Sequence, residues 1–588
     1  MASDTIPDLR AFLDRLRARG EVCEVTAEVD ARLEVAEIHR RVIAARGPVL
    51  LFRNVKGASF PLVTNLFGTP ERVALAFGDR PKRFLQDLVH AAETLVPPSL
   101  GALWKARGLA WQALKVGTKG VRRGPVTEVD EAPDLSRLPA TTSWHGDGGP
   151  FFTLPLVCTS HPESGKPNLG MYRMHIHGPD RTGMHFQIGK GGGYHLREAE
   201  RLGKDLPCTV FLGGPPALIL AAIAPLPEDV PEMLLASLVL GSRLPVVRGR
   251  GPHAVPAGCE LALVGRVLAG VREPEGPFGD HYGYNSLRHD YPVFKVDRVL
   301  RRKDMILPAT VVGRPRQEDF FLGDYLQELL SPLFPLVMPT VRRLWSYGET
   351  GFHSLSAAVV KDRYPREALV SGLRILGEGQ LSLTKVLFLT DRDVDLKDFR
   401  GLLVTLLERM DFRTDVVVLG HTAMDTLDYA GPMVNKGSKM VWMGLGEKRR
   451  SLPTDFTGTL PPGVAGARAF CPGCLVVAGK PVVEDPDAAE RLAREPAFAP
   501  WPLVLLVDDL EEATRSEELF LWTWFTRFDP ARDLLAREVR CEDLHAQLTP
   551  PLVVDARMAP SYPEVLEVDA ATKALVDRRW DQYGIRLR

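Results

Sequence analysis

The sequence has little cysteine, almost no net charge and no long apolar run, and each lack excludes a class of protein. Seven scattered cysteines in 588 residues do not suit a disulfide framework and fit reduced thiols in a cytoplasm. A formal charge of −1 argues against broad nucleic-acid binding, which needs a concentrated basic surface, but leaves room for a local patch around a phosphorylated cofactor. The apolar stretches, such as 216–225, are short and broken by proline, so we expect no transmembrane segment.

The charged amino-terminal stretch 1–20 also lacks the apolar core of a signal peptide, so we expect a cytoplasmic protein. With 45% hydrophobic and 25% charged residues, the chain has the composition of an ordinary globular protein of several domains. Leu9, Phe12, Leu13 and Leu16 recur at helical spacing and predict an opening helix that Gly20 ends. A short strand is expected at 49–52.

The spacing of apolar residues changes along the chain, and this change predicts an α+β fold. Residues 150–320 contain β-like runs separated by Gly and Pro, with few convincing helices, which is typical of a sheet-rich or barrel-like domain. After residue 320, strands and helices alternate. The domains we expect are an α/β domain, a sheet-rich catalytic domain, an α/β domain that serves oligomerisation, and a further α/β lobe, at 1–110, 111–320, 321–445 and 446–588.

Two segments of the carboxy-terminal half resemble one another. Residues 386–415 and 504–533 align without gaps, and the shared positions include Arg409 with Arg527 and Asp411 with Asp529. This similarity predicts a duplicated strand–helix unit, although chance likeness between two amphipathic α/β segments is the alternative. A duplication would bear on architecture and not on chemistry.

The first polar cluster lies at 167–195 and combines Asn168, Arg173, Gln187, Lys190, four histidines and a glycine run. Glycines let the backbone approach a ligand or phosphate closely, yet taken alone such a run is more typical of a flexible hairpin. Each of the histidines is by itself more typical of a structural or surface position than of a metal ligand; they are His175, His177, His185 and His195.

The second cluster, EPEGPFGDHYGY at 273–284, holds Glu275 and Asp280 on a stiff path of prolines and glycines. Paired carboxylates on rigid backbone suit proton transfer, and a nearby arginine would keep one of them ionised. Alone, the segment is more typical of an acidic turn exposed to water.

Several motifs together carry a resemblance that none carries alone. NLGMYR at 168–173, APLPEDVPE at 224–232, EGPFGDHYGY at 275–284 and NKGSKM at 435–440 occur in the order found in the UbiD family of decarboxylases, which the sequence resembles from about residue 8 to residue 445. The resemblance implies a split β-barrel that binds prenylated FMN, with a divalent ion at its phosphate. It also implies catalytic roles for Arg173, Glu275 and Asp280, with Asp280 protonating the substrate carbon.

The resemblance also implies a binding site for the flavin and its metal. The metal, manganese or magnesium with potassium as a further candidate, would be held by Asn168 and Glu232. The family has a histidine where this chain has Gly189, so the third ligand is open. His185 or His195 could replace it, Lys190 could neutralise the phosphate instead, or water could fill the gap. The residues expected at the flavin are Asn168, Met171, Tyr172, Arg173, Gln187, Lys190, Ala222, Ile223, Ala224, Pro225, Glu232 and Lys439.

The activity expected from the resemblance is decarboxylation of an aromatic or conjugated acid, such as a hydroxyaromatic acid of quinone biosynthesis. A flavin prenyltransferase would supply the cofactor, and the chain would form a dimer or larger homo-oligomer. The alternative is a flavin-binding scaffold of the same fold without turnover, which the glycine at 189 motivates. The solitary Cys471–Cys474 motif favours a structural role over a redox pair or half of a zinc site.

Overall fold

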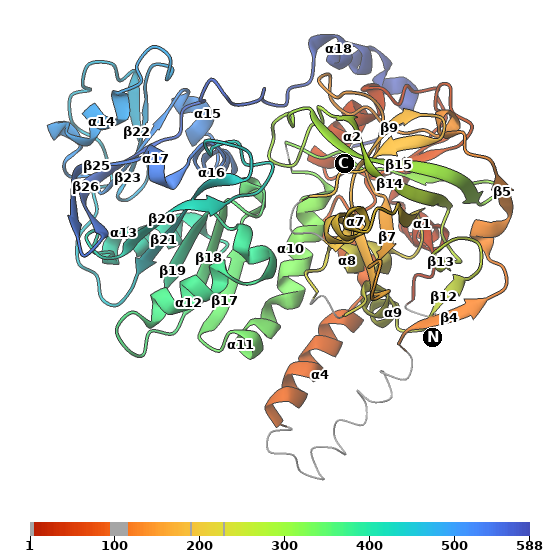
Figure 1. Cartoon of the computed structure of the whole chain (residues 1–588). Coiled ribbons are helices and arrows are strands. Elements are labelled where there is room, and N and C mark those ends of the chain that lie inside the picture. The colour runs from red at the N-terminus through yellow and green to blue at the C-terminus, as the bar shows by residue number, and fades with distance from the viewer. Residues whose placement is uncertain (1–4, 95–115, 188–190, 227–229, 315, 588) are drawn as a thin grey trace. The chain divides into compact units, whose positions relative to one another are not determined.

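The computed structural model describes residues 5–94, 116–187, 191–226, 230–314 and 316–587, which divide into two compact units (Figure 1). The first unit comprises the described residues up to Leu329 together with those from Glu564 onward, and the second comprises Leu330–Pro563. Among the helices described, none has both the length and the apolar character required to cross a membrane.

The first unit opens with a small sheet whose order is β1-β2-β3-β16. Helix α1 forms as predicted because the Asp8 side chain caps its start, accepting a hydrogen bond from the Ala11 N–H at 2.9 Å, and its four apolar residues are buried. The predicted strand at 49–52 is confirmed as β2. The elements of this region are α1 (Leu9–Ala18), β1 (Val22–Val25), α2 (Glu34–Ala44), β2 (Val49–Phe52), β3 (Leu62–Thr64), α3 (Pro70–Phe77), α4 (Arg80–Thr94) and β16 (Leu307–Pro308).

A nine-stranded sheet forms the centre of the first unit. Its order is β6-β9-β10-β15-β14-β11-β7-β8, with β5 paired to β15. The sheet is curled like half a barrel, and its closure into a split barrel stays a prediction. The strands are β5 (Val129–Glu131), β6 (Phe151–Phe152), β7 (Leu156–Ser160), β8 (Pro167–Met171), β9 (Met174–Gly178), β10 (Arg181–Gly183), β11 (Leu206–Leu212), β14 (Leu261–Glu275) and β15 (His289–Arg301).

Three helices contact this sheet: α7 (Gly191–Arg201), α8 (Pro216–Ile223) and α9 (Glu232–Leu240). A separate three-stranded sheet contains β4 (Thr118–Val121), β12 (Leu244–Val247) and β13 (Val255–Pro256). Helix α8 was not predicted, because its prolines were interpreted as breaks. Pro216 is in fact the first helical residue, where a missing N–H costs nothing.

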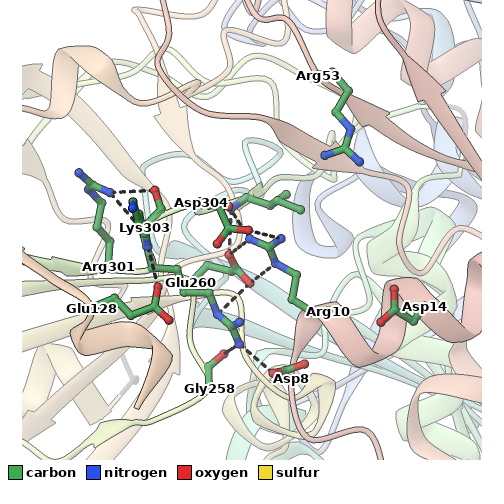
Figure 2. Close-up of polar contacts among 12 residues, drawn as sticks. Asp8, Arg10, Asp14, Arg53, Glu128, Gly258, Glu260, Arg301, Lys303 and Asp304 are labelled. Carbon is green, nitrogen blue, oxygen red and sulfur yellow. Dashed lines mark hydrogen bonds and ion pairs between the residues drawn. The ribbon is translucent and has the colours of Figure 1, made fainter. Parts of the chain in front are cut away.

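An ion-pair cluster attaches α1 to the hairpin of β14 and β15 (Figure 2). Arg10 donates two hydrogen bonds of 2.9 Å to the carboxylate of Glu260, which is fully buried. Arg302 lies 3.3 Å from the same carboxylate and 2.7 Å from Asp8. A buried carboxylate needs such partners, so the cluster fixes the amino-terminal helix to the sheet that carries the site.

The last residues of the chain return to the first unit. Helix α18 (Ala570–Arg579) packs on α2, where Arg41 Nη1 lies 2.6 Å from Asp577 Oδ1. Just before it, Val565 forms an antiparallel bridge with Tyr284. From the sequence we expected this segment to belong to the lobe at 446–588. The structure places residues 564–588 in the first unit, because they contact residues that are distant in the chain.

The second unit contains two five-stranded sheets of the same design. Their orders, β17-β18-β19-β21-β20 and β22-β23-β24-β26-β25, match strand for strand, and in each the outer pairs are antiparallel and the inner pairs parallel. The strands are β17 (Val341–Ser346), β18 (Leu355–Val360), β19 (Val386–Thr390), β20 (Val416–Ala423), β21 (Lys436–Gly444), β22 (Gly466–Cys471), β23 (Cys474–Ala478), β24 (Leu503–Val507), β25 (Leu534–Glu542) and β26 (His545–Asp555).

The predicted duplication is therefore present in the structure, and it extends to the turns. In the first copy the Asp411 N–H donates to Asp415 Oδ2 at 2.8 Å, and in the second the Asp529 N–H donates to Asp533 Oδ2 at 2.7 Å. The two copies share one core, in which the rings of Phe388 and Trp442 lie in the same cluster as Trp524. Chance likeness of two segments does not explain a repeated topology.

Helices form layers around the two sheets (Figure 1). The shared core includes α13 (Phe399–Arg409) and α16 (Glu517–Thr526), while α12 (Glu367–Leu376) covers the other face of the first sheet and α14 (Ala488–Ala493) that of the second. The remaining described helices of this unit are α11 (Phe334–Val337), α15 (Leu510–Thr514) and α17 (Pro530–Asp533), whereas α10 (Glu318–Leu330) belongs to the first unit up to Leu329. Cys471 and Cys474 are buried free thiols opposite each other in the hairpin of β22 and β23. This placement suits the structural role.

Candidate active site

Arg173 lies in the two-residue connection between β8 and β9, with a side chain that is only 9% exposed. Its Nε donates to Glu275 Oε1 at 2.9 Å and its Nη2 to Oε2 at 3.3 Å. Its Nη1 donates to Asp280 Oδ2. The structure thus brings together the three residues that the resemblance implied as catalytic.

The two carboxylates are positioned by the end of β14 and the loop after it. Glu275 is the last residue of β14, and Gly276 has a φ of 88°, which favours glycine. The loop is held by Asp147, whose Oδ1 accepts a hydrogen bond from the Gly279 N–H at 2.7 Å. Ser286 closes the loop, because its hydroxyl oxygen accepts from the Phe278 N–H at 3.1 Å and also from Arg173 Nη2 at 3.1 Å.

The electrostatics of the site favour ionised carboxylates. Burial disfavours the charge of Glu275, but the Arg173 guanidinium and the hydrogen bond from His185 outweigh it and lower the pKa to about 2. Asp280 follows the same pattern, since burial opposes its charge while Arg173 and His281 hold its pKa well below the usual range. The pKa of Arg173 is raised by its two carboxylates, although burial opposes this. Arg173, Glu275 and Asp280 thus form a triad of charged side chains that is largely removed from water.

Each carboxylate also contacts a histidine. His185 Nδ1 lies 2.9 Å from Glu275 Oε2, and its ring stacks on Tyr291 with centroids 4.4 Å apart. His281 Nδ1 lies 2.6 Å from Asp280 Oδ1. The result is a continuous chain of contacts through His185, Glu275, Arg173, Asp280 and His281.

The residues predicted to hold metal and phosphate lie around the start of α7. Asn168 is on β8, and its buried Nδ2 has no hydrogen-bond partner among the described residues. A Cβ on Gly191 would stand 2.1 Å from Asn168 Oδ1, so any other residue there would displace the Asn168 side chain. Glu232 begins α9, accepts the Leu169 N–H at 3.0 Å, and has a pKa raised by burial. An amide whose buried Nδ2 has no partner among the described residues, a carboxylate and a glycine-rich helix start can together receive a phosphate and a cation.

The other predicted flavin contacts are spread along neighbouring elements. Tyr172 is buried, and its hydroxyl oxygen accepts the Gly192 N–H at 3.2 Å, so it supports the start of α7. Met171 ends β8 and Gln187 is half-buried, while Lys190, like Gly189, lies outside the described residues. The segment 222–225 forms the end of α8 and the two residues after it, with Ala222 and Ile223 half-buried, Ala224 buried and Pro225 exposed.

Lys439 belongs to the second unit, on β21, and not to the unit that contains the triad. Its Nζ donates to the Thr384 carbonyl oxygen at 2.7 Å, and burial lowers its pKa to about 8. Beside it, Lys385 and Asp428 form a buried ion pair of 2.7 Å.

The other three histidines of the polar cluster at 167–195 lie against protein groups. Burial lowers the pKa of His175 and His195 to about 4, and His195 Nδ1 lies 2.9 Å from Thr159 Oγ1. His177 Nδ1 lies 2.8 Å from Glu273 Oε2. Within the described ranges no group of three or more His, Cys, Asp or Glu side chains is arranged to hold a metal.

Comparison with known proteins decides the family. Residues 13–92, 119–315 and 320–444 match the N-terminal, Rift-related and C-terminal domains of 3-octaprenyl-4-hydroxybenzoate carboxy-lyase, UbiD. The chain belongs to the UbiD family. Members of this family are decarboxylases, and the chain is a carboxy-lyase of the UbiD type. The match ends at residue 444, so the second five-stranded sheet lies beyond it.

Individual relatives agree with this assignment. A Chlamydia trachomatis protein without an assigned function is 51% identical over 98% of this chain and 99% of its own length. A Chlamydia pneumoniae protein, named as one subunit of a 4-hydroxybenzoate decarboxylase, is 49% identical over 98% of both chains. The UbiD-class enzyme HmfF from Pelotomaculum thermopropionicum, solved with FMN, is 26% identical with a TM-score of 0.62, covering 78% of this chain and 98% of its own. An evolved dimeric form of HmfF, solved with prenylated FMN, is 25% identical with a TM-score of 0.61 over the same shares.

The sequence did not assign roles to several residues that the structure places at the triad. His185 was expected to be structural or a substitute metal ligand, yet it contacts Glu275. Ser286 and Asp147 were not singled out, and no local pattern marks them, because they act across the fold. His281 could have been found, since it follows Asp280 directly in the chain.

Proposed function

We propose that this carboxy-lyase removes carbon dioxide, without oxidation and reversibly, from an aromatic or α,β-unsaturated carboxylic acid with the help of prenylated FMN. The observation that carries the proposal is the buried contact of one guanidinium, Arg173, with two carboxylates, Glu275 and Asp280. A scaffold that only binds a flavin has no need of this charged and costly arrangement.

The residues around the start of α7 fit a phosphorylated flavin. The Asn168 Nδ2, which has no partner among the described residues, the small Gly191 and the backbone N–H groups of a helix start are suited to an anionic phosphate. Met171, Gln187, Lys190 and the segment 222–225 are proposed as further contacts, and Lys439 as a cation for the phosphate. Prenylated FMN bound by these residues would supply an electron sink for the pair that departing carbon dioxide leaves behind.

The side chains of the triad have separate roles in this proposal. Arg173 orients the substrate carboxylate, and Glu275 keeps the guanidinium ionised and in place. Asp280 delivers the proton that replaces the carboxyl group on carbon. Ser286 and the Asp147 contact keep the loop of Asp280 at a fixed distance from Arg173.

A divalent cation, Mn²⁺ or Mg²⁺, with K⁺ as a candidate second ion, completes the proposed cofactor site. Asn168 and Glu232 supply oxygen ligands of the kind these ions prefer. We propose that Lys190 or water takes the place of the histidine that Gly189 replaces. The cation would then be held more weakly than in a three-ligand protein site.

The substrate class that we propose is a hydroxyaromatic acid of quinone biosynthesis, handled in the cytoplasm. The support is the name of the Chlamydia pneumoniae relative, which specifies 4-hydroxybenzoate. That name also specifies one subunit of a larger enzyme, so other chains are proposed as partners besides a flavin prenyltransferase that supplies the cofactor.

Self-association is also part of the proposal. The α13 face of the first sheet is already covered by the second copy within this chain, so a homodimer needs another surface. Four apolar side chains are exposed on α11 and α12 and offer one: Leu336, Val337, Val370 and Leu373.

The test is to express the full chain together with a flavin prenyltransferase and to identify the bound flavin by absorbance and mass. The loaded protein is then screened against aromatic acids in heavy water, where deuterium should appear at the lost carboxyl position. Turnover with prenylated FMN supports the proposal. A loaded chain that turns over no acid supports the scaffold instead, and failure to load under conditions that load a relative contradicts both.

A further inference from the structure

The series of contacts through the triad ends in a histidine on each side, and the two histidines differ in their exposure to solvent. At one end His185 is buried, with a side chain that is 7% exposed. At the other end His281 is 26% exposed, while its Asp280 partner is 11% exposed. The charged network therefore has one histidine inside the protein and one that reaches its surface.

The proposed reaction consumes one proton for each molecule of carbon dioxide released. The electron pair of the broken carbon–carbon bond forms the new C–H bond, and the proton comes from Asp280. At rest this carboxylate is ionised, since Arg173 Nη1 and His281 both stabilise its charge. A residue that is ionised at rest must receive a proton before it can donate one.

His281 has the geometry to supply that proton. Its Nδ1 lies 2.6 Å from Asp280 Oδ1, and its own backbone N–H donates to the same oxygen at 2.7 Å. The other carboxylate oxygen, Oδ2, faces Arg173, which does not release protons near neutral pH. Imidazole exchanges protons with water in this pH range, so of these two partners only His281 can protonate Asp280.

The other groups around His281 are consistent with this role. Its ring lies 5.1 Å from that of Tyr282, which is buried. Asp319, at the start of α10, has a pKa that burial raises to about 6 while the charge of His281 lowers it. A second acidic group thus interacts electrostatically with the exposed end of the network.

We infer that His281 carries protons from solvent to Asp280 and holds that carboxylate in position, an inference that rests on the proposed function. In each turnover the Nδ1 proton of the imidazolium passes to Asp280 Oδ1, Asp280 passes a proton to the substrate carbon, and the imidazole takes up a proton from water. No oxidant or reductant takes part. His281 is a positioning residue in this scheme, because it acts through Asp280.

The test compares three variants of the full, cofactor-loaded chain: His281→Ala, His281→Asn and, as the matched buried control, His185→Ala. His281→Ala should lose about 10²-fold or more in kcat with little change in KM, and added imidazole should restore much of it. His281→Asn keeps an N–H donor for Asp280 but cannot titrate, so it should be as slow as the alanine variant. His185→Ala should not respond to imidazole, because its site is closed to solvent.

Wild-type kcat in either His281 variant, or an alanine variant that imidazole does not rescue, overturns the inference. A readout independent of turnover is histidine NMR on the cofactor-free chain, with the His281 signal identified by its loss in His281→Ala. Asp280→Asn removes the carboxylate beside the imidazole and should lower the pKa of that histidine, and no shift also overturns the inference. If the wild type does not decarboxylate any acid, the proposed function fails, and the NMR result still decides whether the two side chains are coupled.

Discussion

Arg173 Nε and Glu275 Oε1 lie 2.9 Å apart although 102 positions separate the two residues in the chain. The contact joins the connection after β8 to the end of β14, and both side chains are removed from water. Charges in such surroundings are kept only where each has its partner, so changes to either residue should have large effects.

Replacing Glu275 by Gln should abolish carbon dioxide release while the flavin stays bound. The amide cannot balance the guanidinium, and a loss of about 10²-fold or more is expected for a broken proton network. Carbon dioxide release and flavin absorbance measure the two effects. Glu273→Gln is the matched control, because Glu273 lies two residues earlier on β14 but pairs with His177 and Arg181. Full activity of Glu275→Gln would remove the triad from the mechanism.

Replacing Arg173 by Leu should destabilise the first unit by about 3–5 kcal/mol, because two buried carboxylates lose their cation. Chemical denaturation followed by tryptophan fluorescence measures the change. The control is Arg201→Ala, which removes an exposed pair with Glu198 and should leave the free energy of unfolding nearly unchanged. Equal losses in the two variants would show that the buried network does not contribute as argued.

Acid should remove the stabilisation that Glu275 provides. Its pKa falls from 4.5 to about 2 on folding, so its contribution is present above pH 4.5 and is lost as pH falls towards 2. Buried histidines such as His195 act at higher pH. Folding lowers the pKa of His195 from 6.5 to about 4, so the free energy of unfolding also falls as pH drops from 6.5 towards 4. The difference in unfolding free energy between the wild type and Glu275→Gln isolates the carboxylate. It should be constant above pH 5 and shrink below pH 4.5, and a difference that grows in acid would contradict the sign.

Replacing Glu232 by Gln should lower the metal content of the loaded protein and reduce flavin retention. The carboxylate is one of two proposed oxygen ligands, and its loss leaves only the Asn168 amide. Metal analysis after dialysis, with flavin absorbance alongside, checks this. Glu198→Gln on the exposed face of α7 is the control. Stoichiometric manganese that survives dialysis in the wild type would show that the cation is not weakly held.

A large share of the fold followed from local patterns. The spacing of Leu9, Phe12, Leu13 and Leu16 predicted α1, and the likeness of residues 386–415 to 504–533 predicted a duplicated strand–helix unit. Such features depend on neighbouring residues and on periodicity, which are present in the chain before it folds. Helix α8 was missed because proline disfavours a helix interior but not its first residue.

The residue types and the motif order of the chain by themselves determined its family, and with it the choice of Arg173, Glu275 and Asp280. Only the tertiary structure decided which other side chains join them. His185 and Ser286 reach the triad through contacts between distant strands and loops, and the return of residues 564–588 to the first unit depends on their partners there. The physical reason is that hydrogen bonds and burial act over a few ångströms of space, which folding arranges without regard to separation along the chain.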